Sequence, residues 1–247
     1  MSWNAKPSGA YSYSSTEGTE NVLEMASILR GQGWTDEAST GAIANSIYEG
    51  GLNPWRWQND QYPWPPGIGG CGLFGFDPWD TYMAKPGSQE MNQSVTTITP
   101  GASPNVGTQQ MRLMYTGEWG WKTECWRIYW PTAQYPDLYT LSVNIRNQYG
   151  SNGKLTIAQY SQINVIDHAI FAFLACFEGP KIPNYSARKS VGEAIYKIIT
   201  GNDPDPQPPD PTYPPDPPIP EEPIPPNDEQ KKVKKGMPIY MMIRKHI

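Results

Sequence analysis

Apolar side chains recur at the three- and four-residue spacing of an amphipathic helix along most of the chain. Runs that alternate between apolar and polar residues, as strands do, are few. The spacing predicts helices over residues 20–30, 35–49, 105–116, 120–130 and 186–199, and a further strong helix within residues 156–177. We therefore expect a mainly α fold with a small irregular or β excursion after residue 50.

The second of these predicted helices has the clearest ends. Thr35 is a natural N-cap, because its hydroxyl can accept from a free backbone N–H of the first turn. Asp36 and Glu37 place negative charge at the helix end that favours it. The pair Gly50-Gly51 suits a left-handed stop. Glu49 is therefore expected to be the last residue of this helix.

Composition divides the chain into parts. Residues 1–19 are polar and rich in Tyr and Ser, which indicates an N-terminal arm. Residues 20–202 contain enough apolar side chains for one folded domain. Residues 203–230 are rich in Pro and Asp and are expected to be a linker. Residues 231–247 place four lysines before a short apolar stretch and are expected to be a docking tail.

The linker has an unusual composition. Thirteen of the 24 residues at 203–226 are proline and six are acidic. Proline fixes φ and lacks a backbone donor, so this segment is expected to be an extended polyproline-II spacer. A disordered tail without a role is the alternative. We expect residues 231–247 to dock on a partner chain by strand addition or packing.

Charge and residue usage exclude several classes of protein. The formal net charge is −5, and no basic stripe runs along the predicted domain, which argues against a nucleic-acid partner. The longest apolar run, residues 169–177, is nine residues, about half of the ~20 that a membrane span needs. Three cysteines at wide spacing and two histidines form no tetrahedral ligand set. We expect no metal, no cofactor and no membrane span.

Glu49 is the most informative position for chemistry. A carboxyl at a helix C-terminus faces the negative end of the helix dipole, and the neighbours Tyr48, Trp55 and Trp57 are aromatic. Both features favour a neutral carboxyl group. Cleavage of a glycosidic bond needs such a group, because the leaving oxygen must be protonated as the bond breaks. The alternative is an ordinary solvated acid at the end of a helix.

Three motifs resemble the phage tail lysozyme family of the lysozyme-like superfamily. Residues 41–54 read GAIANSIYEGGLNP, similar to the family's catalytic helix and the turn that follows it. Residues 70–74 read GCGLF, similar to its Gly-x-Gly-Leu-Phe motif. Residues 173–180 read FLACFEGP and precede Arg188, similar to its last segment and Arg-bearing helix. The motifs occur in the family's order.

This resemblance implies a lysozyme-like α+β fold and a phage tail-associated glycosidase. The family's catalytic glutamate corresponds to Glu49, which would be the general acid. The substrate implied is peptidoglycan, cut at the β-1,4 bond between MurNAc and GlcNAc, during entry through the host cell wall. The protein would sit in the virion tail and bind other tail proteins through its C-terminal segment. Hydrolysis and lytic transglycosylation both need a general acid, so both remain open. A non-enzymatic tail protein is the rival class.

The expected substrate site surrounds Glu49. The glycine-rich stretch 67–75 would let backbone approach a sugar closely. Aromatic rings bind the apolar faces of pyranoses, and Trp55, Trp57, Tyr62 and Trp64 follow Glu49 closely. The expected substrate-binding residues are Tyr48, Asn53, Trp55, Trp57, Gly72, Leu73 and Phe74.

Two further carboxylates have candidate roles. Asp77 is the candidate for an assisting carboxylate, although it precedes Pro78 and equally suits the start of a turn. The family commonly continues Gly-Leu-Phe with Gln and Trp, whereas this chain has Gly75 and Phe76 there. Glu178 is expected to be a structural carboxylate that fixes the last helix through Arg188.

Overall fold

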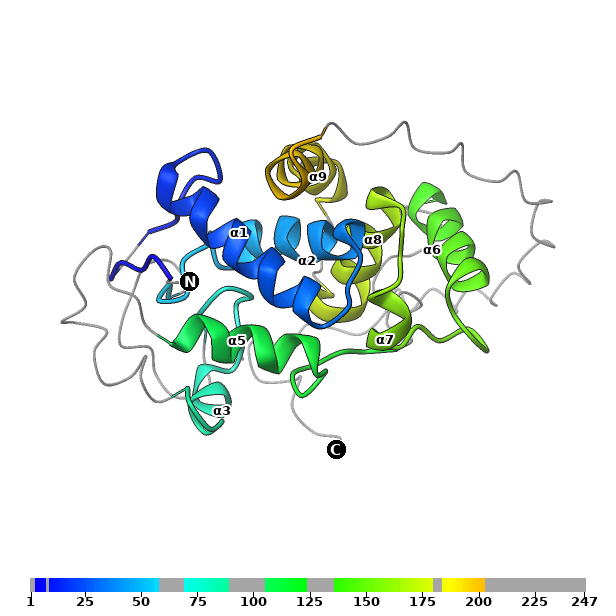
Figure 1. Cartoon of the computed structure of the whole chain (residues 1–247). Coiled ribbons are helices and arrows are strands. Elements are labelled where there is room, and N and C mark those ends of the chain that lie inside the picture. Colours follow the sequence, from blue (N-terminus) through cyan, green and yellow to red (C-terminus); the bar gives the residue numbers. More distant parts are fainter. Residues whose placement is uncertain are drawn as a thin grey trace, which may run out of the picture. The chain divides into compact units, whose positions relative to one another are not determined.

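The computed structural model describes residues 3–7, 9–57, 69–88, 105–123, 136–179 and 184–202 (Figure 1). The predicted linker and docking tail, residues 203–247, lie outside these ranges, and so do Tyr62 and Trp64. Expectations for those residues stay predictions.

The described part is mainly helical, which confirms the predicted fold class. Within it, β structure is limited to isolated bridges, two of which join Cys71 to Trp57 and to Phe76. The helical elements are α1 (Thr16–Gly31), α2 (Asp36–Glu49), α3 (Trp79–Met83), α5 (Val106–Tyr115), α6 (Pro136–Gln148), α7 (Ile157–Tyr160), α8 (Ile166–Phe173), the π-helical turn η3 (Leu174–Glu178) and α9 (Tyr185–Thr200).

Helix α2 is the central element, because it packs against α1, α8 and α9. In the view of Figure 1, α9 lies above α1 and α2, and α5 lies below them. Gly41 shows how closely α2 and α8 approach, since a Cβ there would lie 2.5 Å from the carbonyl carbon of Ala169. Most side chains of α2 are buried, so packing fixes the position of its C-terminal end.

The ends of α2 follow the sequence prediction. The Thr35 hydroxyl accepts from the backbone N–H of Ala38 at 3.0 Å, which makes Thr35 the N-cap. The helix ends at Glu49, and Gly50 donates its N–H to the carbonyl of Ser46 at 2.8 Å. Gly51 has a φ of +56°, a backbone conformation that glycine adopts without strain. The turn after Glu49 therefore has the glycines that its geometry needs.

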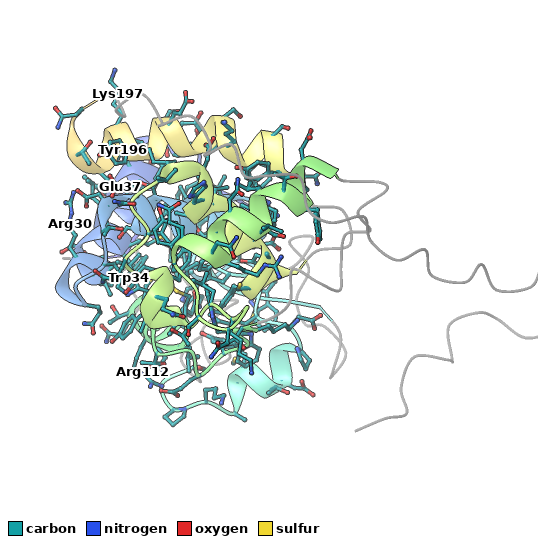
Figure 2. All side chains as sticks on the ribbon, turned by 90° about the vertical axis from the view of Figure 1, so that its right-hand side faces the viewer. Arg30, Trp34, Glu37, Arg112, Tyr196 and Lys197 are labelled. Carbon is teal, nitrogen blue, oxygen red and sulfur yellow. The ribbon has the colours of Figure 1, made fainter. Side chains whose placement is uncertain are left out.

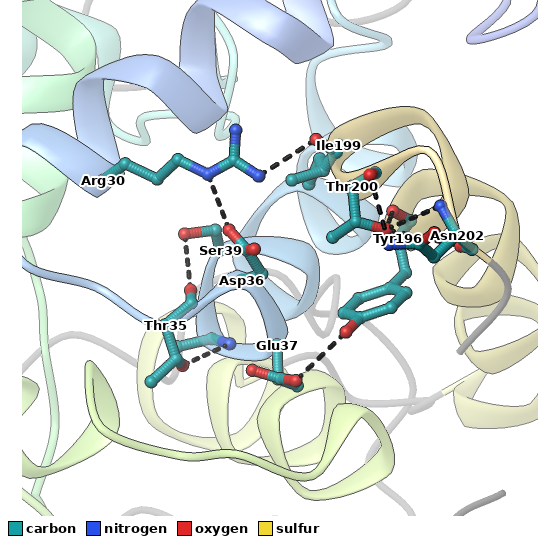
Figure 3. Close-up of polar contacts among 10 residues, drawn as sticks. Arg30, Thr35, Asp36, Glu37, Ser39, Tyr196, Ile199, Thr200 and Asn202 are labelled. Atoms are coloured by element: carbon teal, nitrogen blue, oxygen red, sulfur yellow. Dashed lines mark hydrogen bonds and ion pairs between the residues drawn. The ribbon is translucent and has the colours of Figure 1, made fainter. Parts of the chain in front are cut away.

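Polar contacts hold the C-terminal end of α9 against the start of α2 (Figure 3). Arg30 of α1 donates to Asp36 at 2.7 Å and to the carbonyl of Ile199 at 2.9 Å. Tyr196 donates to Glu37 at 3.3 Å. Figure 2 shows Arg30, Glu37 and Tyr196 on one side of the domain. Half-exposed pairs contribute little stability, so their main effect is to orient α9 along α2.

The N-terminal residues, expected to form an arm over residues 1–19, contact the folded domain. Trp3 and Ala5 are buried with the rest of the core. The indole N–H of Trp3 donates to Thr108 at 2.9 Å, and Tyr11 donates its backbone N–H to Gly51 at 2.8 Å. Helix α1 also begins at Thr16, earlier than predicted. The polar composition of this segment gave no sign of the anchor, which is the single tryptophan ring of Trp3.

Other differences concern the later helices. Residues 120–123 are not helical, and residues 124–130 lie outside the described part. Helix α6 was not predicted from the spacing. The helix expected within residues 156–177 is divided into α7, α8 and η3. Among the described residues, no helix is both long enough and apolar enough to cross a membrane.

Candidate active site

Glu49 lines a pocket of about 350 Å³ at the C-terminal end of α2. One wall comes from the last turn of α2, and the other comes from the loop that carries the second motif. The lining residues are Tyr48, Glu49, Arg56, Gly70, Cys71, Gly72, Gly75 and Asp77.

Arg188 of α9 holds the Glu49 carboxyl group. Its Nη2 donates to Glu49 Oε1 at 2.7 Å, and the side chains of Arg188 and Glu49 are 4% and 28% exposed. Nη1 donates to the carbonyl and to Oδ1 of Asn45 at 3.2 and 2.9 Å. The guanidinium also lies 4.9 Å from the centre of the Tyr48 ring, a cation–π distance. A buried cation on α9 therefore fixes the orientation of Glu49.

Gln110 fixes the loop opposite Glu49. Its Oε1 accepts from the backbone N–H of Leu73 at 2.8 Å, and its Nε2 donates to the carbonyl of Pro54 at 2.8 Å. A Cβ on Gly72 would lie 2.6 Å from this amide, so only glycine fits there. The second motif thus presents backbone, rather than side chains, to the pocket.

At Gly75 the backbone of this loop approaches Glu49. Its hypothetical Cβ would lie 3.5 Å from Glu49 Oε2, and its φ is +60°. Of the sequence-predicted site residues, Tyr48, Gly72 and Asp77 line the same pocket as Glu49. Tyr48 is 41% exposed, so its ring is open to a bound molecule.

The remaining predicted binding residues belong to the core. Trp55 and Trp57 are each 1% exposed, and Leu73 and Phe74 are also buried. These side chains present no open face for a sugar, which contradicts the expected stacking role of both tryptophans. The physical reason is that the aromatic loop folds inward, where large rings remove more apolar area from water than at the surface.

Asn53 likewise has a structural position. Its Nδ2 donates to the carbonyls of Lys6 and Gly9, both at 2.9 Å, and its Oδ1 accepts from the Trp55 N–H at 3.1 Å. The side chain is fully buried. Asn53 therefore ties the N-terminal residues to the turn after α2 and is not at the pocket surface.

Glu178, at the end of η3, lines a second pocket of about 450 Å³ that shares Gly75 and Asp77 with the first. Burial raises the pKa of its carboxyl well above the usual value, and the charge of Glu49 raises it further, against lowering by Arg188 and Lys122. Arg188 bonds to Glu49 and Asn45, which corrects the expectation that it pairs with Glu178. No feature of the sequence spacing indicated the Glu49–Arg188 pair.

Other chemistries find little support in the described residues. Burial raises the pKa of the Cys71 thiol well above its ordinary value, and Asp77 adds to the effect, so the thiol is neutral and a poor nucleophile. In the described ranges, no group of three His, Cys, Asp or Glu side chains is placed to hold a metal ion.

Glu49 thus ends a buried helix and faces a pocket that three glycines help to line, in a mainly helical domain. Residues 20–199 match the family described as phage tail lysozyme. The chain therefore belongs to the phage tail lysozyme family, which indicates a peptidoglycan-hydrolysing enzyme associated with phage tails. No curated protein matches the chain at a significant level.

Proposed function

We propose that the protein is a tail-associated glycosidase that cleaves the β-1,4 bond between MurNAc and GlcNAc, with Glu49 as the general acid. The observation that supports this most is the position of Glu49, partly exposed in a pocket whose opposite wall is backbone. A glycan strand can approach such a wall closely, since no side chain projects from Gly72 or Gly75.

Chemically, Glu49 protonates the glycosidic oxygen as the bond to the anomeric carbon breaks. The sugar then develops oxocarbenium character, which a nearby negative charge stabilises. Asp77 is the exposed carboxylate that lines the same pocket, and we propose it as the assisting group. Attack by water gives hydrolysis, whereas attack by a hydroxyl group of the sugar itself gives an anhydro end.

The proposed location is the virion tail, where the enzyme would act on the host cell wall during entry. The family indicates a phage tail-associated protein. Attachment to other tail proteins through residues 203–247 remains a prediction from the composition of that segment.

The test of the function is release of soluble muropeptides from isolated peptidoglycan by the full chain. Mass spectrometry then separates hydrated from anhydro ends, and so separates hydrolysis from lytic transglycosylation. A folded protein that binds peptidoglycan but releases no fragments would instead support the non-enzymatic tail protein.

Replacing Tyr48 tests the open side of the pocket. Tyr48→Ala removes a half-exposed ring beside Glu49, so we expect muropeptide release to fall roughly 5- to 20-fold, corresponding to loss of about one aromatic contact. The thermal unfolding midpoint is expected to change little. Tyr48→Phe keeps the ring and should retain most activity. Wild-type activity in the alanine variant would remove Tyr48 from the binding site.

A further inference from the structure

Glu178 is a half-buried carboxylic acid, with one buried carboxyl oxygen, that the proposed reaction does not use. It ends η3, a π-helical turn, and π-helical turns often occur at functional sites. Gly179 stops the turn in the left-handed conformation, with its N–H donating to the Leu174 carbonyl at 2.8 Å. Among the described residues, Glu178 Oε1 is buried and has no hydrogen-bond partner. A buried polar atom without a partner is costly and needs an explanation.

The charged groups around Glu178 come from several elements. Glu49 of α2, Arg188 of α9 and Lys122 after α5 all influence it electrostatically. Asp77, Lys85 and Glu118 lie around the pocket that it lines. Because burial raises its pKa well above the usual value, Glu178 holds a proton where exposed glutamates are ionised.

Arg188 is the link between the two glutamates. Its Nη1 and Nη2 donate to Asn45 and Glu49, but its Nε is buried and has no acceptor within the described part of the chain. Glu178 Oε1 is thus a buried acceptor without a donor. The Nε–H group of Arg188 is a buried donor without an acceptor. The positive charge of Arg188 acts to lower the pKa of Glu178, against the effect of burial. An ionised Glu178 would supply the missing acceptor.

The ion pair raises a question about the general acid. The ion pair between Glu49 and Arg188 requires an ionised Glu49 carboxylate. Protonation of the leaving oxygen instead requires a proton on the same carboxyl group. A second carboxyl beside the same arginine resolves this, because the cation can be neutralised by either one.

We propose that Glu49, Arg188 and Glu178 form one unit that shares a single acid proton, and that Glu178 is a positioning residue that lends this proton to Glu49. This rests on the proposed function of Glu49. When Glu178 is neutral, Arg188 pairs with an ionised Glu49. When the proton leaves the Glu178 carboxyl and binds the Glu49 carboxylate, Arg188 neutralises Glu178 instead. The net charge of the unit is zero in both states, because the negative charge moves from one glutamate to the other while Arg188 stays positive.

The pH profile of Glu178→Gln tests this proposal. Glutamine cannot take a negative charge, so Arg188 stays paired with Glu49 and the unit has no proton to lend. We expect about tenfold less muropeptide release at pH 7, recovery toward the wild-type level at lower pH, and an optimum about one pH unit lower. Glu178→Asp keeps an ionisable group whose ordinary pKa is lower than that of Glu, so its optimum should move down by less than in Glu178→Gln.

Several outcomes would overturn the proposal. A wild-type profile in Glu178→Gln, or loss of activity at every pH in a folded variant, contradicts proton sharing. If Glu178→Gln fails to fold, the profile of Glu178→Asp decides, with a moved optimum in favour and an unmoved one against. An active Glu49→Gln would refute the proposed function itself. An inactive Glu49→Gln beside an unmoved Glu178→Gln profile refutes only this inference.

Thermal unfolding gives a readout independent of activity. A carboxyl with a raised folded-state pKa binds its proton more tightly in the folded chain, so it costs stability as pH rises above its ordinary value of 4.5 toward the raised pKa. Glu178→Gln removes that cost. The unfolding midpoint of the variant, relative to the wild type, should therefore rise steadily with pH above about 4.5. A difference that stays constant with pH would mean that Glu178 does not hold its proton in the fold.

Discussion

Glu49→Gln is expected to release muropeptides at least about 100-fold more slowly than the wild type at every pH. Glutamine keeps the shape of the side chain but has no proton to give to the leaving oxygen. Its amide oxygen can still accept from Arg188 Nη2, which lies 2.7 Å from Glu49 Oε1 in the wild type. The fold and glycan binding should therefore persist, and the loss should appear in turnover.

Glu37→Gln is the matched control for this substitution. Glu37 lies in the first turn of the same helix, far along the axis from the pocket, and accepts from Tyr196 at 3.3 Å. We expect it to retain wild-type activity, because the glutamine oxygen can still accept from Tyr196 and this contact does not involve the pocket. Pelleting with insoluble peptidoglycan measures binding by both variants. Lysis by Glu49→Gln at the wild-type rate would show that another group supplies the proton.

Local signals in the sequence sufficed to place Glu49. Thr35 caps the start of α2, and glycines end it directly after Glu49, and both signals act within a few residues of the structure that they specify. Gly72 and Gly75 of the glycine-rich stretch line the pocket, and their contact with substrate stays a prediction. Helix caps and glycine turns depend on the backbone conformations that each residue type allows, so they can be predicted from the local sequence.

Partners brought together by folding were not predictable in the same way. Arg188 lies far along the chain from Glu49, and periodicity alone does not reveal which carboxylate of the core it meets. The burial of the Trp55 and Trp57 side chains likewise depends on how the irregular loop folds, which the local sequence does not reveal. Aromatic density is the same for a core and for a sugar-binding surface, so composition does not distinguish the two.

Substitution at Trp3 tests whether the N-terminal residues are part of the folded domain. Trp3→Ala is expected to lower the free energy of unfolding by about 3–5 kcal/mol, because it removes a buried indole and leaves a cavity. The hydrogen bond from Trp3 Nε1 to Thr108, 2.9 Å long, is lost as well. Denaturant unfolding measures the change. Leu23→Ala, at a side chain 40% exposed on α1, is the control and should change little.

A double-mutant cycle with Gly107 shows whether the indole packs on α5 as the structure has it. A Cβ on Gly107 would lie 2.3 Å from the Trp3 ring, so Gly107→Ala should destabilise the wild-type protein. In the Trp3→Ala background the same change meets open space and gains about 0.8–1.0 kcal/mol of helix propensity within α5. The two substitutions should therefore be strongly non-additive. Additive effects, or an unchanged stability in Trp3→Ala, would show that the Trp3 ring does not pack on α5.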